Sequence, residues 1–222
     1  MFRKILIYII IFYSITYYYT FFKWYFSDNQ KIIEEALGLS LSASISMFIA
    51  IILIHYFYYP RHEIDRAKVI SFPPIIFLFS MNLAFLISMS NMYFFQLYDV
   101  PKELDILRSI PAGILLIVIA LVILNLALRE FDKNNEDPIP TTSSKLIIDK
   151  NIYSYSRNPM YLGLLIMQVG IGMLLSIVHI IFFTFFTFII LKYYVILPEE
   201  KYLENKFGKT YYEYKKSVRR WI

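Results

Sequence analysis

The sequence contains no cysteine, which excludes disulfide bonds, thiolate metal ligands and a cysteine nucleophile. Histidine is also scarce. The three histidines, His55, His62 and His179, are far apart in the chain and show none of the short spacings that are typical of zinc ligands. We therefore predict that the protein binds no metal.

Charged residues make up only 18% of the 222 residues, whereas 58% are hydrophobic and 19% are aromatic. This balance is typical of a protein with several membrane-spanning segments. The net charge of +5 does not indicate nucleic-acid binding, because the basic residues flank apolar stretches and form no continuous stripe. We predict no nucleic-acid partner.

Long uncharged runs predict an all-α fold. About twenty apolar residues in a helix match the hydrocarbon core of a bilayer, and helical hydrogen bonds satisfy the backbone there. Within residues 1–128, four runs are expected to span the membrane. They are residues 5–26, 37–59, 73–98 and 106–128. The polar segment 129–158 is predicted to be a cytoplasmic loop.

The last part of the chain, residues 159–222, is predicted to form a helical hairpin and a tail. From Pro159 to Pro198 the only charged residue is Lys192, and this run is about twice the length that one crossing needs. Two passes that turn near Ser176 are expected, which makes about six membrane helices in all. From Glu199 onward, Lys, Glu and Tyr recur at helical spacings and predict an amphipathic helix that lies on the membrane.

Lysine and arginine are distributed unequally between the two sides of such a six-pass protein. One side carries most of them, including those near both chain ends, and the other side carries Lys23, Lys31, Lys102 and Arg108. Because positively charged loops stay in the cytoplasm, both termini are predicted to be cytoplasmic. The basic tail, with Arg219 and Arg220, is predicted to contact anionic lipids.

The two ends of the predicted hairpin carry residues that indicate a binding site. Arg157 precedes Pro159, which suits a first helical turn whose open amides, together with the guanidinium, favour a carboxylate or phosphate. Gly163 allows a ligand or a neighbouring helix to approach closely. At the other end, Glu199 and Glu200 suit an ammonium, a sulfonium or ribose hydroxyls. S-adenosylmethionine carries all of these groups, so it is the predicted cofactor.

Each end also has an ordinary structural interpretation. An arginine before a proline is a common helix start with a side chain that reaches toward water. Two acids after Pro198 make a favourable first helical turn. The combination of both ends with the aromatic tail that follows is much rarer than either end alone.

From about Thr141 to Ile222, the chain resembles the superfamily of isoprenylcysteine carboxyl methyltransferases and phospholipid methyltransferases, which are integral membrane enzymes. The matching motifs are Arg-Asn-Pro-Met-Tyr-Leu-Gly at 157–163, Glu-Glu-Lys-Tyr-Leu at 199–203, Phe-Gly-Lys-Thr-Tyr-Tyr-Glu-Tyr at 207–214 and Val-Arg-Arg at 218–220. The resemblance implies a cytosol-facing S-adenosylmethionine site and a lipophilic acceptor that arrives from the bilayer. The residues implied to bind the cofactor are Tyr153, Arg157, Asn158, Tyr161, Gly163, Glu199 and Glu200.

Two positions depart from the family's pattern. Asn158 stands where the prenylcysteine enzymes usually carry histidine, which leaves the acceptor open between a prenyl-type carboxylate, a lipid amine and similar groups. Asn151 stands where the family commonly has a glycine two residues before an aromatic residue, and asparagine tolerates the left-handed backbone. The four N-terminal spans are expected to lie on the acceptor side. No catalytic base is assigned.

We therefore predict a methyltransferase that uses S-adenosylmethionine and acts on a lipophilic acceptor at the cytoplasmic face of the membrane. One alternative is a nicotinamide-dependent membrane reductase of the sterol-reductase type, although Glu199 and Glu200 would repel the phosphates of its cofactor. A second alternative is a membrane scaffold without catalytic activity.

Overall fold

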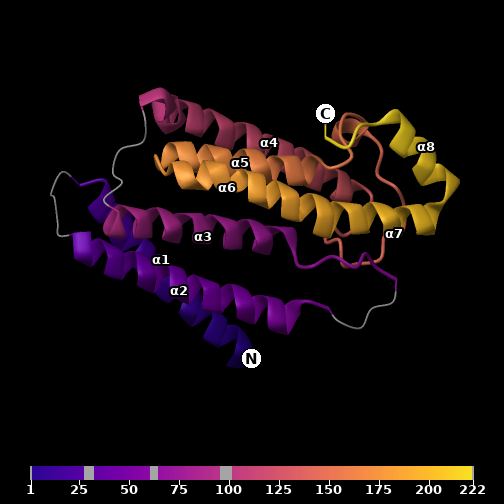
Figure 1. Cartoon of the computed structure of the whole chain (residues 1–222). Coiled ribbons are helices and arrows are strands. Elements are labelled where there is room, and N and C mark those ends of the chain that lie inside the picture. Colours follow the sequence, from indigo (N-terminus) through magenta and orange to yellow (C-terminus); the bar gives the residue numbers. More distant parts are fainter. Residues whose placement is uncertain (1, 28–32, 61–64, 96–101, 222) are drawn as a thin grey trace.

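The computed structural model describes residues 2–27, 33–60, 65–95 and 102–221 (Figure 1). These residues contain helices and no strands, which confirms the predicted all-α fold. The helices are α1 (Phe2–Tyr25), α2 (Ile33–Tyr58), α3 (Pro73–Phe94), η1 (Lys102–Arg108), α4 (Ile110–Lys133), η2 (Asn151–Ser154), α5 (Pro159–Leu174), α6 (Val178–Leu191), η3 (Lys192–Ile196), α7 (Leu197–Phe207) and α8 (Lys209–Ser217).

Within the described residues, five helices are long and apolar enough to cross a membrane, and α5 is a shorter apolar helix of 16 residues. The protein is therefore a polytopic integral membrane protein. Helices α5 and α6 form the predicted hairpin, and Ser176 lies in the turn between them with a φ of 56°. The predicted end of the third span at Tyr98 lies outside the described residues.

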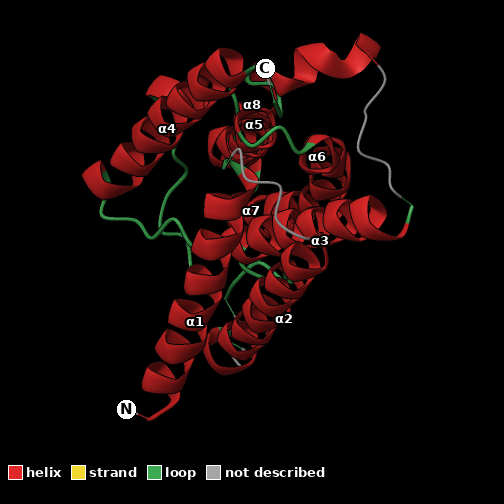
Figure 2. Cartoon of the chain, turned by 90° about the vertical axis from the view of Figure 1, so that its left-hand side faces the viewer, coloured by secondary structure: helices red, strands yellow, loops and turns green. Residues whose placement is uncertain are grey.

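The membrane helices pack in the order α1, α2, α3, α6, α5, α4, each against the next. In Figure 2, α3, α5 and α6 lie between α4 and the α1–α2 pair. Consecutive membrane helices run in opposite directions, so the start of α5 and the end of α6 lie at the same end of the bundle, together with α7 and α8 (Figure 1). This end holds the polar residues of the hairpin.

Glycine allows α4 and α5 to approach closely. A Cβ atom at Gly113 would lie 2.6 Å from the backbone nitrogen of Leu174 and 2.8 Å from the carbonyl oxygen of Gly170. Likewise, a Cβ atom at Gly163 would lie 2.9 Å from the Cγ atom of Leu124. Small residues are the usual means of close helix packing in membranes. Gly163 therefore serves a neighbouring helix, one of the two uses predicted for it.

Polar side chains inside the bundle bond to one another. The hydroxyl of Thr187 on α6 lies 2.8 Å from Oε1 of Gln168 on α5 and 2.6 Å from Oγ of Ser80 on α3, and all three residues are buried. Because unpaired polar groups are costly in hydrocarbon, these contacts fix how the three central helices sit against each other.

Helix α7 extends beyond the membrane. The continuous helical stretch from Val178 to Phe207 has 30 residues. At 1.5 Å per residue this is about 45 Å, longer than the hydrocarbon core of about 30 Å. Its apolar part ends near Leu197, and the acids and lysines follow. The membrane-spanning part therefore stops near Leu197, and Glu199 and Glu200 lie outside it.

The tail is two helices, where the sequence predicted one. Gly208, with a φ of 53°, separates α7 from α8. With a ψ of −122°, Gly208 adopts a backbone conformation that is strained for any residue with a side chain, so glycine suits this break. The break turns α8 back across the end of the bundle, so the tail covers the hairpin ends (Figure 1).

Candidate functional site

The hairpin brings its two polar ends into contact. Pro159 opens α5, and Arg157 lies just before it, while Glu200 lies in the first turn of α7. Nη2 of Arg157 donates to Oε1 of Glu200 at 2.9 Å. The backbone amides in the first turn of α5 have no partners within the helix and face the same region.

The buried side chain of Arg157 bonds to both the hairpin and the tail. Its side chain is only 7% exposed. Nη1 donates to the carbonyl oxygens of Lys215 and Val218, and its backbone nitrogen donates to the carbonyl oxygen of Arg219. Nε is buried and has no hydrogen-bond partner. The guanidinium therefore holds the tail in place in addition to pairing with Glu200.

Glu200 joins two arginines. Besides the bond from Arg157, it accepts hydrogen bonds from Nε of Arg220 at 3.0 Å and from Nη2 of Arg220 at 2.7 Å, and the residue is 4% exposed. Burial acts to raise the pKa of this carboxyl, but the hydrogen bonds and charges of Arg220 and Arg157 outweigh it, so the pKa lies below its ordinary value. Glu200 is therefore negatively charged, and both of its carboxylate oxygens accept hydrogen bonds from arginines.

Glu199 is in a different environment from its neighbour. It is partly exposed, and Oε2 accepts a hydrogen bond of 2.6 Å from the hydroxyl of Tyr161 on α5. Burial raises the pKa of Glu199 to about 7, the bond from Tyr161 acts to lower it, and the charge of Glu200 raises it further. Both the charged and the neutral form of this carboxyl are therefore populated near neutral pH.

Aromatic residues close the site from the side of η2 and α8. Tyr153 is buried against Phe131 of α4, with ring centroids 5.8 Å apart, and its carbonyl oxygen accepts from the hydroxyl of Tyr214 at 2.8 Å. Burial raises the pKa of Tyr153. Asn151, two residues earlier, has a φ of 53°, so it adopts the left-handed backbone that asparagine tolerates. This turn directs Tyr153 inward.

Two small adjoining cavities lie among these groups. The first, of about 80 Å³, is enclosed by the loop that follows α4, by the aromatic residues and by Arg157 and Glu199. The second, of about 50 Å³, lies at the start of α5. It is lined by Asn158, Met160, Tyr161, Glu199 and Glu200 among others. Glu199 and Arg157 border both, so we treat the pair as one polar cavity.

A larger apolar pocket of about 510 Å³ adjoins the polar cavity. It lies between the starts of α3 and α5, the end of α4 and the loop after α4. Its walls include Phe72, Leu124 and Leu128, and it shares Met160, Tyr161 and Pro138 with the polar cavity. The hydroxyl of Tyr161 therefore marks the junction between a polar space and an apolar space.

Of the seven residues predicted to bind a cofactor, six lie around the polar cavity. They are Tyr153, Arg157, Asn158, Tyr161, Glu199 and Glu200. Gly163 lies one turn further along α5 and faces α4. The side-chain amide of Asn158 donates to the carbonyl oxygen of Arg220 at 3.0 Å, so it also fixes the tail.

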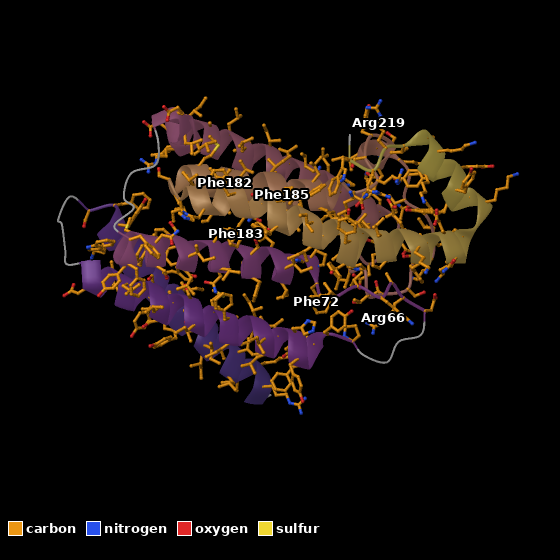
Figure 3. All side chains as sticks on the ribbon, in the orientation of Figure 1. Arg66, Phe72, Phe182, Phe183, Phe185 and Arg219 are labelled. Atoms are coloured by element: carbon orange, nitrogen blue, oxygen red, sulfur yellow. The ribbon has the colours of Figure 1, made fainter. Side chains whose placement is uncertain are left out.

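Three residues that the sequence analysis did not assign to the cofactor site also belong to it. Tyr211 and Tyr214 line the first cavity, and Arg220 pairs with Glu200. The spacing of the two tyrosines places them on one face of a helix, which was a usable signal. Arg220 was expected to contact lipid, but its guanidinium faces Glu200, and only Arg219 of the tail pair is exposed at the surface (Figure 3).

Among the described residues, no group of three or more His, Asp or Glu side chains is placed to hold a metal ion. His62 lies outside the described residues. The imidazole of His179 lies 3.0 Å from the amide of Asn91, within the bundle.

A family model described as phospholipid methyltransferase matches residues 109–210. This region contains α4, the loop after it and the whole hairpin through α7. Protein-S-isoprenylcysteine O-methyltransferase of Schizosaccharomyces pombe is 35% identical to this chain over 75 residues. Both matches support the resemblance of this part of the chain to the isoprenylcysteine carboxyl methyltransferase and phospholipid methyltransferase superfamily. The aligned residues are 33% of this chain and span 31% of that relative. No solved structure matches the chain.

The region that the family model matches contains nearly all of the polar cavity. Its walls from Phe131 to Leu203 fall inside the matched residues, whereas Tyr211 and Tyr214 lie just beyond them. The first three helices lie outside the match. Phe72, Pro73 and Pro74, which close one side of the apolar pocket, come from that unmatched part.

Proposed function

We propose that this protein is a methyltransferase that uses S-adenosylmethionine to methylate a lipophilic acceptor at the cytoplasmic face of the membrane. The observation that supports this most directly is that a polar cavity and an apolar pocket lie side by side and share Tyr161 and Met160 in their walls. A charged soluble donor requires the first kind of space, and a lipid-like acceptor requires the second.

The groups around the polar cavity fit the donor chemically. Glu199 forms no ion pair among the described residues, and it borders both parts of the cavity. It would hold the ribose hydroxyls or the cationic part of the donor. The open amides at the start of α5 would hold its carboxylate, next to the positive Arg157. Bound there, the donor supplies an electrophilic methyl group on a positively charged sulfur.

Arg157 and Glu200 would act differently from what their residue types alone suggest. Each already pairs with the other, and Arg157 also bonds to two tail carbonyls. We propose that this pair fixes the positions of the helix start and the tail, while Glu199 and the backbone amides contact the donor. Pre-positioned groups of this kind reduce the reorganisation that binding and reaction require.

The loop between α4 and η2 must move for a donor to enter. Pockets for small ligands have volumes of roughly 300–1,000 Å³. The two parts of the polar cavity, at about 80 and 50 Å³, are much smaller. Residues 136–148 of the loop form one wall. An outward movement of this wall would enlarge the cavity without disturbing the buried ion pairs.

The apolar pocket would hold the tail of the acceptor and direct its reactive end toward Tyr161. The relative's name indicates an isoprenylcysteine acceptor and the family's name a phospholipid acceptor. For a carboxylate acceptor, the nucleophilic oxygen needs no base. For an amine acceptor, a proton must leave the nitrogen, and Glu199, with a pKa of about 7, is placed at the junction to receive it.

Binding of the donor to the purified protein tests this proposal. Calorimetry should detect S-adenosylmethionine binding, and hydrogen exchange should change most in residues 136–148, because the loop must rearrange. Labelled methyl groups should then appear in lipids extracted from membranes that contain the protein. Binding of a reduced nicotinamide dinucleotide, without any response to S-adenosylmethionine, would instead support a reductase.

We propose that both termini and the polar cavity face the cytoplasm. Most lysines and arginines lie at the end of the bundle that carries α7 and α8. Fusions of a reporter that is active only in the cytoplasm should be active at either chain end. Activity at only one end, or at neither, would contradict this orientation.

A further inference from the structure

A second polar depression lies on the opposite side of α7 from the polar cavity. This basic groove, of about 610 Å³, is lined by Arg66, Lys68, Tyr193, Lys201, Tyr202 and Asn205. On α7, Lys201 and Asn205 are one turn apart and share a face, whereas Glu199 and Glu200 face the hairpin. Helix α7 therefore separates an acidic site from a basic one.

The cations of the basic groove come from two distant parts of the chain. Arg66 and Lys68 lie on the segment between α2 and α3, and Lys201 lies on α7 (Figure 3 labels Arg66). The backbone nitrogen of Ile70 donates to the carbonyl oxygen of Tyr194 at 3.0 Å, which attaches that segment to η3. The fold thus holds the three cations around one depression.

The acid among the described residues of this segment already has a cationic partner. No Asp or Glu of the described residues lines the basic groove. The nearest acid on the same segment, Asp65, pairs with Lys206 at 2.5 Å and accepts a hydrogen bond from Ser143. Lys68 and Lys201 are exposed. Lys68 and Lys201 therefore present exposed positive charge at the groove.

The basic groove lies at the level where the membrane ends. Leu197, at the end of the apolar run, forms part of its wall, and so does Tyr193, which is 52% exposed. Tyrosine at this depth is typical of the interface between hydrocarbon and headgroups. A ligand in the groove would therefore have both an anionic head and an apolar body.

We propose that the basic groove binds the phosphate headgroup of an anionic membrane phospholipid. Arg66, Lys68 and Lys201 would contact the phosphate, and Tyr193 and Leu197 would contact the start of the acyl chains. This lipid is distinct from the methyl acceptor, because the basic groove and the apolar pocket at Tyr161 share no lining residue. The inference does not depend on the proposed methyltransferase activity.

Native mass spectrometry of the detergent-purified protein tests the lipid site, with phosphatidylglycerol and phosphatidylcholine of identical acyl chains as probes. The wild type should bind phosphatidylglycerol preferentially. The variant Lys68→Gln/Lys201→Gln should lose roughly thirtyfold in affinity for it, since each cation near an anionic lipid contributes roughly fivefold. Lys68→Arg/Lys201→Arg should keep the affinity, because it keeps both charges.

The matched control is Lys209→Gln/Lys216→Gln, which removes the same charge from α8. It should change the affinity less than about threefold, because surface charges away from the ligand are screened. An equal loss in the control would show diffuse attraction to the whole surface, and equal binding of both lipids by the wild type would also refute the site. Tighter binding of inorganic phosphate than of phosphatidylglycerol would point to a soluble ligand and overturn the proposal. Donor affinity, measured on the same variants, reports separately on the methyltransferase hypothesis.

Discussion

Replacement of Glu200 by alanine is expected to lower the free energy of unfolding by about 3–5 kcal/mol, the usual cost of removing one partner from a buried ion pair. The substitution leaves the guanidinium of Arg157 buried, with Nε already lacking a hydrogen bond. It also removes the carboxylate that pairs with the guanidinium of Arg220. For a chain of this length the apparent melting temperature should fall by about 6–20 °C.

Intrinsic fluorescence during heating in detergent measures this effect. Glu200→Gln should lie between the wild type and Glu200→Ala, since the amide oxygen still accepts hydrogen bonds but carries no charge. Glu213→Ala is the matched control. Its carboxylate is 64% exposed and lies 3.8 Å from Lys209, so its loss should cost under about 1 kcal/mol. Equal melting temperatures for Glu200→Ala and Glu213→Ala would contradict the structural role of Glu200.

The predicted helical hairpin follows from composition alone. An apolar run that has one charge and is twice the length of a membrane crossing has to turn back. The number of residues that one crossing needs sets the position of the turn. Ser176 lies at that turn. The contact between Arg157 and Glu200 across 43 positions is a consequence of this geometry. The sequence also allowed a positive φ at Asn151, because asparagine is one of the few residue types that tolerate it, and the structure has that conformation.

The division of roles between Glu199 and Glu200 was not predictable. Neighbouring residues on a helix point about 100° apart, so one of the two acids had to face the arginines and the other the cavity. Which one does so depends on the turn before them. Residues Lys192–Ile196 form a π-helical turn, which rotates the side chains of the following residues about the helix axis. No residue pattern marks such a turn.

Arg220 and Gly163 illustrate a related limit. A terminal arginine beside a membrane helix fits a lipid contact by type, yet the glycine break at Gly208 turns the tail back over the hairpin and directs Arg220 to Glu200. Gly163 was open to two uses, and the position of Leu124 on α4 decides between them. Both outcomes depend on contacts between segments far apart in the sequence.

The second prediction concerns Glu199 and separates ligand binding from folding. Glu199→Gln keeps an oxygen that accepts from the hydroxyl of Tyr161, and the side chain is only partly buried, so the protein should fold normally. If Glu199 contacts the donor, loss of a charge-assisted hydrogen bond should weaken S-adenosylmethionine binding by about ten- to a hundredfold. Glu204→Gln on the same helix should leave the affinity unchanged, because Glu204 pairs with Lys215 and lies outside the polar cavity.

The pH dependence of donor affinity makes this test specific to the carboxylate. Burial raises the pKa of Glu199 to about 7, so the group loses its proton as the pH rises through that value. The negative form attracts the cationic donor, and wild-type affinity measured by calorimetry should therefore increase from pH 6 to pH 8. Glu199→Gln cannot titrate, so its affinity should not follow this increase. A steep pH dependence that persists in Glu199→Gln, or wild-type affinity in that variant, would mean that the donor binds elsewhere.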